Sequence, residues 1–289
     1  MSSLPDNNCN TLELSSVDKI STIDQKVFST TYFKSLTPVV IQDLSKTWPA
    51  YKKWTPDFFK EQYGDKQVKV YDASFVAAGE NYMSSARTMS LRDYINQVMT
   101  TSQDLRMFLY NIKSEIPELV NDINFPSLVD GLSKSFVFMF FGCKGSVTQM
   151  HFDIDMSHVL HTAIRGKKTV YLFPYEQSKN LHRYPFTCRS YVDVEKPDVE
   201  KFPGLKKAKG YKVVIEAGDT LYIPSGYWHH FVYDEAGYAV SLRCASQTWS
   251  GKAHGLYNLF IMQSLDRLMN LVSPQAWFEW KERRALQAN

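Results

Sequence analysis

The chain has 289 residues, of which 44% are hydrophobic and 22% are charged, so it can bury a sizeable core and extended disorder is excluded. Its net charge of +3 permits an acidic partner but does not require one. None of the four cysteines forms a C-x-x-C pair, no apolar run approaches a membrane span, and residues 1–10 lack an apolar signal core, so we expect a cytoplasmic protein without a cysteine zinc site or a membrane partner.

The first half of the chain mixes helical and strand patterns. Residues 1–15 are polar and are expected to form a flexible tail, and residues 16–134 to form an α/β part that packs on the rest. Thr55 followed by Pro56 is a helix-start signal. The predicted elements are a short helix within 17–33, helices at 55–63 and 90–99, strands at 37–42, 68–71 and 107–110, and a loop over 73–87.

After Pro126 short strands follow one another at even intervals, separated by Gly-Asp and Gly-Lys turns. This spacing is typical of an antiparallel barrel or jelly roll. We therefore predict a mainly β fold with helical additions, whose core is residues 135–250 and carries a long polar insertion over 175–209. The predicted strands are 135–141, which should be buried, 147–153, 159–165, 169–173, 212–216, 220–223, 228–233 and 238–244.

Residues 251–289 are predicted to form C-terminal helices. The first has apolar side chains at a helical period, which we expect to fold onto the barrel: Leu256, Leu259, Phe260, Leu265, Leu268 and Met269. Ser273 and Pro274 begin a second helix. Trp277, Phe278 and Trp280 spread over more than one face of it, and a second apolar face requires a partner. We predict a homodimer whose interface includes Trp277 and Trp280.

Three residues have the spacing and chemistry of a metal site. His151 and Asp153 are two positions apart on a predicted strand, so their side chains point to the same face. His229 follows a Gly-Asp turn, an apolar strand and Pro224, which places it on a second strand of the barrel. Two histidines and one carboxylate form the ligand set of non-haem Fe(II) oxygenases. An isolated H-x-D is equally consistent with a surface strand.

Other polar residues surround this predicted site. His158 and His161 are alternative ligands, for which we favour a second-layer or pocket-lining role, and His230 should point to the opposite strand face from His229. Lys168 opens an apolar strand, where a lysine is most often solvent-facing, but a 2-oxoglutarate cosubstrate would need such a cation for its distal carboxylate. Thr148 could add a hydroxyl, or could simply be a strand former.

These motifs together resemble the JmjC and cupin-8 family of 2-oxoglutarate oxygenases. The resemblance is carried by T-x-x-H-x-D at 148–153, by Gly-Lys-Lys at 166–168 and by the sequence from Gly218 to His230. It covers residues 136–246 well and is strongest to the branch that hydroxylates asparagine in hypoxia-inducible factor.

The resemblance implies a double-stranded β-helix. It also implies Fe(II) on His151, Asp153 and His229, O2 as the oxidant, and 2-oxoglutarate held by Thr148 and Lys168. Phe138 and Phe140 would line the pocket. Tyr110 is the best match to the family tyrosine that touches 2-oxoglutarate, with Phe108 nearly as good.

The chain departs from the family pattern at two places. Lys168 lies 17 residues after His151, about two more than usual, and Ser157-His158-Val159 replaces the expected asparagine. Cys244 stands where the asparagine-hydroxylating branch has a polar residue. The implied activity is hydroxylation of a protein side chain. Two alternatives stay open: a modified RNA base as substrate, since 206–212 is lysine-rich, and a metal-binding cupin without turnover.

Overall fold

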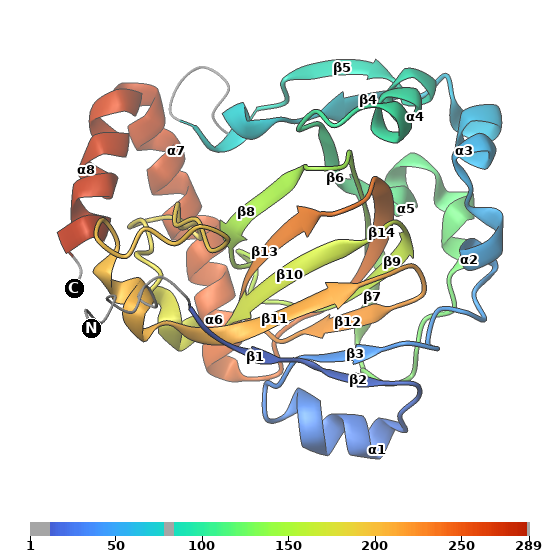
Figure 1. The fold of residues 1–289 in the computed structure, drawn as a ribbon, viewed down its shortest axis with the longest axis horizontal. Coiled ribbons are helices and arrows are strands. Elements are labelled where there is room, and N and C mark those ends of the chain that lie inside the picture. Colours follow the sequence, from blue (N-terminus) through green and yellow to red (C-terminus); the bar gives the residue numbers. More distant parts are fainter. Residues whose placement is uncertain (1–11, 78–83, 288–289) are drawn as a thin grey trace, which may run out of the picture.

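Two facing, mainly antiparallel sheets form the centre of the protein in a computed structural model that describes residues 12–77 and 84–287 (Figure 1). The smaller sheet has the strand order β1-β11-β10-β13-β8 and the larger β2-β3-β12-β9-β14-β7-β6. Their strands are β1 (Glu13–Ser16), β2 (Asp18–Ile20), β3 (Val39–Ile41), β6 (Arg106–Asn111), β7 (Leu132–Gly142), β8 (Val147–His151), β9 (His158–Arg165), β10 (Lys168–Phe173), β11 (Lys209–Ile215), β12 (Thr220–Ile223), β13 (Trp228–Tyr233) and β14 (Gly237–Cys244).

Aliphatic side chains from both sheets meet between them and fill one end of the jelly roll. Val170 and Leu172 of β10 pack with Val159 and Ala163 of β9 and with Leu221 of β12. The evenly spaced strands predicted after Pro126 are confirmed, and so is the jelly-roll fold. Strand β7 is not buried on both faces as predicted: its side chains alternate, with Val137, Met139 and Phe141 buried and Phe136 exposed by 57%.

The N-terminal part covers the outer face of the larger sheet. Its helices pack aromatic and aliphatic residues against Val137, Met139 and Phe141 of β7 in one large cluster. Thr55 caps its helix as predicted, accepting a hydrogen bond from Phe58 N at 3.0 Å. The helices are α1 (Gln25–Phe28), which continues as the π-helical η1 (Ser29–Phe33), α2 (Pro49–Lys53), α3 (Pro56–Tyr63), α4 (Leu91–Thr100) and α5 (Ile112–Glu115), and the short hairpin is β4 (Gln67–Val70) and β5 (Arg87–Ser90).

Two predicted irregular segments are more ordered than expected. Part of the predicted 1–15 tail forms β1, which pairs in parallel with β11; residues 1–11 lie outside the described residues. The predicted loop over 73–87 begins with the 3₁₀ helix η2 (Ala73–Val76), and residues 78–83 are also outside the description. The insertion between β10 and β11 buries Leu181, Val192 and Phe202 against Phe173 and Trp228, so it covers the outer face of the smaller sheet.

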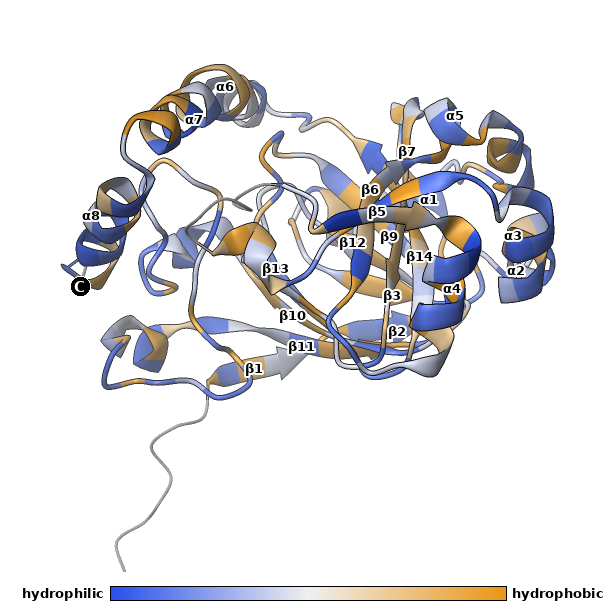
Figure 2. Ribbon diagram, turned by 90° about the horizontal axis from the view of Figure 1, so that it is seen from above, coloured by the Kyte–Doolittle hydropathy of each residue, from blue (hydrophilic) through white to orange (hydrophobic). Residues whose placement is uncertain are grey.

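The C-terminal helices stand beside the open end of the sheets (Figures 1 and 2). The first is continuous, from α6 (Trp249–Tyr257) through the π-helical turn η6 (Asn258–Met262) to α7 (Gln263–Val272), and α8 (Pro274–Gln287) folds back along it. Asp266 of α7 accepts hydrogen bonds from Trp277 Nε1 at 2.8 Å and from Lys281 Nζ at 2.7 Å, which ties the two helices together.

The two helices differ in burial in the opposite sense to the prediction. Trp277 is buried within the chain, stacked on Trp280 with ring centroids 4.9 Å apart and packed against Phe186. Aromatic residues of the insertion cover α8, which the sequence pattern did not show. The first helix instead leaves most of its apolar side chains in solvent, with exposed fractions of 57% for Leu256 and 70% for Phe260.

Candidate metal and cosubstrate site

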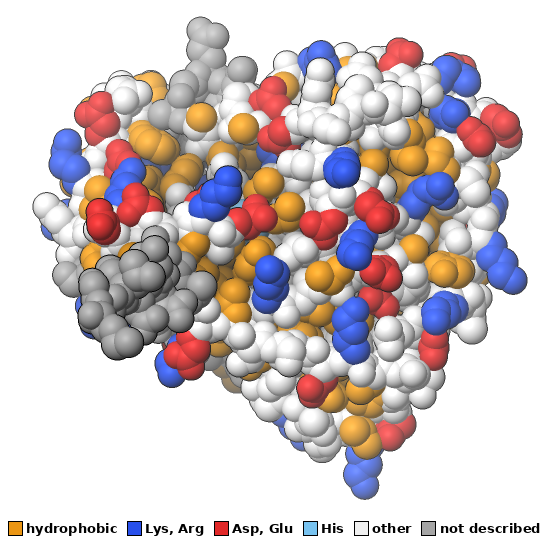
Figure 3. All heavy atoms as spheres, in the orientation of Figure 1, with side chains coloured by type: hydrophobic (Ala, Val, Ile, Leu, Met, Phe, Trp, Pro, Cys, Tyr) orange, Lys and Arg blue, Asp and Glu red, His pale blue; other side chains and the backbone are white. Residues whose placement is uncertain are grey.

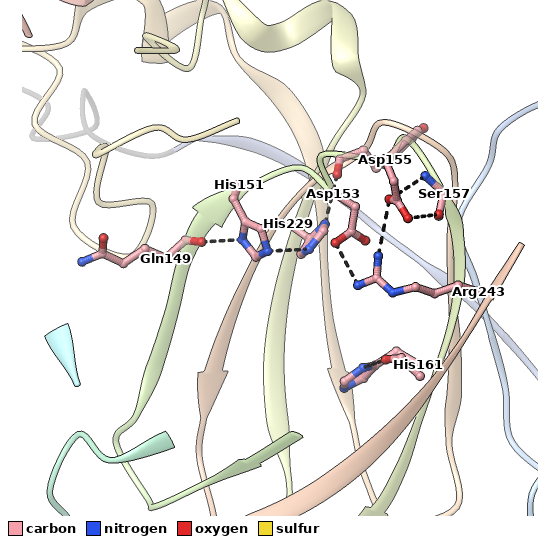
Figure 4. Close-up of polar contacts among 10 residues, drawn as sticks. Gln149, His151, Asp153, Asp155, Ser157, His161, His229 and Arg243 are labelled. Carbon is pink, nitrogen blue, oxygen red and sulfur yellow. Dashed lines mark hydrogen bonds and ion pairs between the residues drawn. The ribbon is translucent and has the colours of Figure 1, made fainter. Parts of the chain in front are cut away.

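The three predicted ligands meet at the open end of the jelly roll (Figure 4). His151 is the last residue of β8 and pairs with His229 of β13 in the sheet register. Their Nε2 atoms are 3.1 Å apart, and one potential ligand atom from each of His151, Asp153 and His229 lies within 4.8 Å of the others. Asp153 is beyond the end of β8, so the same-face strand argument places His151 but not Asp153.

The orientation of the two imidazoles is fixed by backbone carbonyls. His151 Nδ1 lies 2.8 Å from Gln149 O, and His229 Nδ1 lies 3.0 Å from Tyr227 O. A ring nitrogen next to a carbonyl must carry the proton, so both Nε2 atoms present lone pairs to each other. Burial lowers the pKa of both histidines, which disfavours a proton between them. A metal cation satisfies this donor pair, and these residues therefore fit one.

Asp153 supplies the negative charge of the site. Burial by itself would raise the pKa of Asp153, but the positive charge of the Arg243 guanidinium, 2.9 Å away, is the main influence that opposes burial, and the pKa is about 2. The carboxylate is therefore ionised across the neutral pH range. Two neutral imidazoles and one carboxylate form the facial set that binds Fe(II) and leaves positions open.

A cavity of about 230 Å³ extends from these ligands into the barrel. Thr148, Phe140 and Lys168 line it as predicted, together with Tyr233 and His161. The solvent-facing alternative for Lys168 is wrong, since only 1% of this residue is exposed. Burial lowers the pKa of Lys168 to about 7, and no described carboxylate forms an ion pair with it.

The surroundings of Lys168 form a cradle for an anion. Its Nζ lies 3.2 Å from His161 Nε2 and 4.4 Å from the centre of the Tyr233 ring. His161 Nδ1 in turn lies 2.8 Å from Ser241 Oγ. A buried ammonium with only neutral neighbours is costly until a negative charge joins it. The distal carboxylate of a dicarboxylic acid would supply that charge.

Tyr110 is not among the residues that line this cavity, so the structure does not support its predicted contact with the cosubstrate. Strand β6 has an irregularity between Met107 and Tyr110, and Leu109 adopts a left-handed φ of 52°. This break in alternation turns Phe108 and Leu109 towards the cavity. Tyr233 is the tyrosine that lines the cavity. The sequence offered a signal for this residue, because residues 229, 231 and 233 share one face of β13.

The contacts of the remaining histidines show which of them line the cavity. His161 lines the cavity as predicted, whereas His158 does not: its Nδ1 lies 2.9 Å from Tyr222 Oη and 3.2 Å from Ser225 N. His230 faces away from the ligands, as predicted, with its ring 5.8 Å from that of Tyr171. Arg243, which shares a face of β14 with Ser241, also lines the cavity.

The sequence profile of the family described as a cupin-like domain matches residues 24–245, which is most of the chain. The chain belongs to this family. The predicted membership of the JmjC and cupin-8 group is therefore confirmed at family level. The match begins in the N-terminal part and ends just after β14, so the cupin-like domain includes all of the residues proposed for the site.

Several named proteins resemble this cupin-like domain. Lysine-specific demethylase 8 of Xenopus tropicalis is 27% identical over 215 residues, covering 71% of this chain and 47% of that protein. Lysine-specific demethylase JMJ30 of Arabidopsis thaliana is 29% identical over 242 residues, covering 77% and 53%. tRNA wybutosine-synthesizing protein 5 of Gallus gallus is 25% identical over 226 residues, covering 71% and 69%.

These relatives define the wider family only. The chain spans about half the length of the two demethylases. The relatives do not single out the asparagine-hydroxylating branch. Among residues 12–77 and 84–287, no helix combines the length and apolar character needed to cross a bilayer.

The buried Lys168 leads to a pH-dependent stability. Its pKa is about 7 in the fold and about 10.4 in the unfolded chain, so between these values the unfolded chain binds more protons and stability rises with pH. Below pH 7 the full cost of burying the charge applies. We expect Lys168→Met to be more stable than the wild type at pH 6.5, with the difference shrinking towards pH 10. Urea unfolding of both metal-free proteins measures this, and a difference that is constant with pH would contradict it.

Proposed function

We propose that this protein is an Fe(II)- and 2-oxoglutarate-dependent oxygenase that hydroxylates a side chain of another protein. The observation that carries the proposal is the juxtaposition, in one cavity, of two facing Nε2 lone pairs beside an ionised carboxylate and a buried lysine without a described carboxylate partner. When bound, Fe(II) and 2-oxoglutarate together activate O2 and supply the oxidant.

The chain's own residues have distinct roles in this proposal. His151, Asp153 and His229 hold the metal, with both imidazoles kept in the required tautomer by carbonyl oxygens. Lys168 and Thr148 bind the distal carboxylate, and Phe140 and Phe231 form apolar walls that exclude water. Burial of Lys168 makes its ion pair with a dicarboxylate stronger than it would be in water.

A cupin that binds metal without turnover is the first alternative. Such a protein would need the three ligands but no buried cation nearby. Lys168 is only 1% exposed, and its charge in this position disfavours the empty fold. This cost is difficult to explain without an anionic ligand, which supports the enzyme over the binding protein.

A modified RNA base is the second alternative, since one relative is named as a tRNA-modifying protein. The predicted basic stretch does not form an isolated positive patch: Lys209 pairs with Glu13 at 3.0 Å, and Lys206 borders Glu195, Asp198 and Glu200. On the face seen in Figure 3, acidic and basic side chains are interspersed. This pattern favours a protein substrate over a polyanion.

The three described cysteines are unpaired, which supports the expected cytoplasmic location.

The function is tested by measuring succinate release from 2-oxoglutarate by the iron-loaded chain. A second arm captures substrates from a cell extract with a manganese-loaded, inert form and identifies the oxidised residue by mass spectrometry. Hydroxylation of a captured protein supports the proposal. Oxidation of a tRNA base instead would move the substrate to the RNA class, and metal binding without succinate release would favour the cupin without turnover.

We further propose a homodimer, with its interface on the first C-terminal helix in place of Trp277 and Trp280. Eight apolar residues of this helix are exposed, at spacings that repeat along one side: Trp249, Leu256, Tyr257, Phe260, Ile261, Leu268, Leu271 and Val272. In Figure 2 hydrophobic segments recur along α6 and α7 at the edge of the molecule. An apolar face of this extent typically marks an interface, and a two-fold dimer buries it on both copies.

Sedimentation of the full chain at micromolar concentration is expected to give a dimer. Replacing Phe260 and Leu268 together by glutamate should give a folded monomer, because the charges would be buried at the interface without partners. Phe136→Glu is the matched control, since Phe136 is 57% exposed and belongs to β7 and not to this helix. A wild-type monomer, or a dimer that persists in the double variant, would contradict this interface.

A further inference from the structure

Each of the three proposed metal ligands is held by a second group, and for Asp153 that group is a charged side chain. His151 and His229 are on strands, and their Nδ1 atoms face backbone carbonyls. Asp153 is in the loop after β8, where the sheet cannot fix its direction. Its Oδ1 accepts a hydrogen bond from Arg243 Nη2 at 2.9 Å (Figure 4). The position of this carboxylate therefore depends on Arg243.

Arg243 is itself held from three sides. It belongs to β14, paired with Val159 of β9, and its side chain is 12% exposed. Its Nη1 lies 3.5 Å from Asp155 Oδ1, and its guanidinium lies 5.3 Å from the centre of the Phe138 ring. A planar guanidinium between two carboxylates has little freedom to rotate.

The loop that carries both carboxylates is fixed from its other side. Asp155 accepts hydrogen bonds from Ser157 N at 3.2 Å and from Ser157 Oγ at 2.5 Å. Helix α6 packs so closely that a Cβ atom at Gly255 would lie 2.6 Å from Asp155 O. Asn258 Nδ2 donates to Ile154 O at 3.1 Å. Arg243 is thus the link between a rigid strand and a rigidly supported loop.

We infer that Arg243 is a positioning residue that holds Asp153 as a one-oxygen ligand and so preserves the open positions of the metal. The inference rests on the proposed function. A carboxylate can bind a metal through one oxygen or both, and here Arg243 engages Oδ1. A metal with three protein donors keeps open positions for O2 and for 2-oxoglutarate, which would bind through two of its atoms. A second oxygen from Asp153 would occupy one of these positions and compete with 2-oxoglutarate.

The test uses Co(II) as a spectroscopic probe in wild type and Arg243→Met. Methionine keeps much of the side-chain volume but releases the Asp153 carboxylate. We expect the variant to bind one Co(II), with a changed absorption spectrum, and to bind 2-oxoglutarate about 10- to 100-fold more weakly by calorimetry, which is the range by which loss of ligand-orienting residues lowers metal affinity or activity. Arg243→Lys should recover part of the affinity, because an ammonium can pair with Asp153 but cannot bridge both carboxylates.

Arg165→Gln is the control for loss of one positive charge. Arg165 is the exposed last residue of β9, and its replacement should change neither the Co(II) spectrum nor the affinity for 2-oxoglutarate. A wild-type spectrum and affinity in a folded Arg243→Met protein would overturn the inference. Failure of the wild type itself to bind Co(II) and 2-oxoglutarate would overturn the proposed function. If Arg243→Met does not fold, Arg243→Gln gives the decision, because its neutral amide cannot form an ion pair with Asp153: a wild-type spectrum and affinity in that folded variant would overturn the inference.

Discussion

Asp153→Ala is expected to abolish metal-dependent turnover of 2-oxoglutarate and to leave the fold intact. The substitution removes the only charged donor of the proposed ligand set, and two neutral imidazoles hold a divalent cation far less tightly. We expect metal affinity to fall by roughly 100-fold or more, since even residues that only orient a ligand contribute 10- to 100-fold. Metal content after dialysis and succinate release are the two measurements, with circular dichroism as the check on folding.

His230→Ala is the matched control for this prediction. His230 neighbours His229 in sequence and is as deeply buried, but it faces Tyr171 on the other side of β13. Its loss should leave the metal in place. Full activity of Asp153→Ala would refute the ligand assignment. Loss of iron from His230→Ala, with iron retained in His229→Ala, would mean that the two histidines had been assigned in the wrong order.

Lys168→Ala is expected to weaken 2-oxoglutarate binding by roughly 100-fold or more and to leave metal binding unchanged. Losing one partner of a buried, charge-assisted pair typically costs a few kcal/mol, because the other charge stays desolvated. Lys168 Nζ is held beside His161 and the Tyr233 ring, in the lining of the cavity, where it can pair with the distal carboxylate. Titration of 2-oxoglutarate into the manganese-loaded variant measures the effect.

Lys167→Ala separates this effect from a general loss of positive charge. Lys167 is the preceding residue, and its side chain is 39% exposed in a 3.2 Å ion pair with Glu216. We expect its replacement to change 2-oxoglutarate affinity little, since exposed pairs contribute at most about 1 kcal/mol. If Lys168→Ala binds the cosubstrate as tightly as the wild type, another cation that lines the cavity, such as Arg106 or Arg243, must hold the distal carboxylate.

Local sequence signals predicted the elements that carry the site, and long-range packing decided the rest. Cap residues such as Thr55 and the alternation in β13 depend on neighbours along the chain, so they were recoverable. Asp153 was paired correctly with His151, but the reason given was incomplete. Strand β8 ends between these two residues, and the carboxylate is oriented by Arg243, which comes 90 residues later in the sequence.

The errors come from features that a periodicity cannot show. Tyr110 was misplaced because the bulge in β6 shifts the side-chain alternation by one, and nothing in its flanking residues indicates a left-handed Leu109. The two C-terminal helices have similarly apolar faces. Which of these faces is covered depends on how the insertion between β10 and β11 folds. Phe186 packs on Trp277, whereas no described segment covers Phe260.

The π-helical turn at Asn258–Met262 determines how the residues after it are rotated about the helix axis relative to those before it. A π-turn accommodates one extra residue and rotates everything after it by about 100° relative to a regular α-helix. On one face, Asn258 reaches the ligand loop; on the other, Phe260 and Ile261 point to solvent. Deleting or inserting a residue in a regular part of this helix would turn Gln263 and the apolar stripe of α7 to new directions, because an α-helix turns by about 100° per residue. The length of this helix is therefore constrained more tightly than its composition.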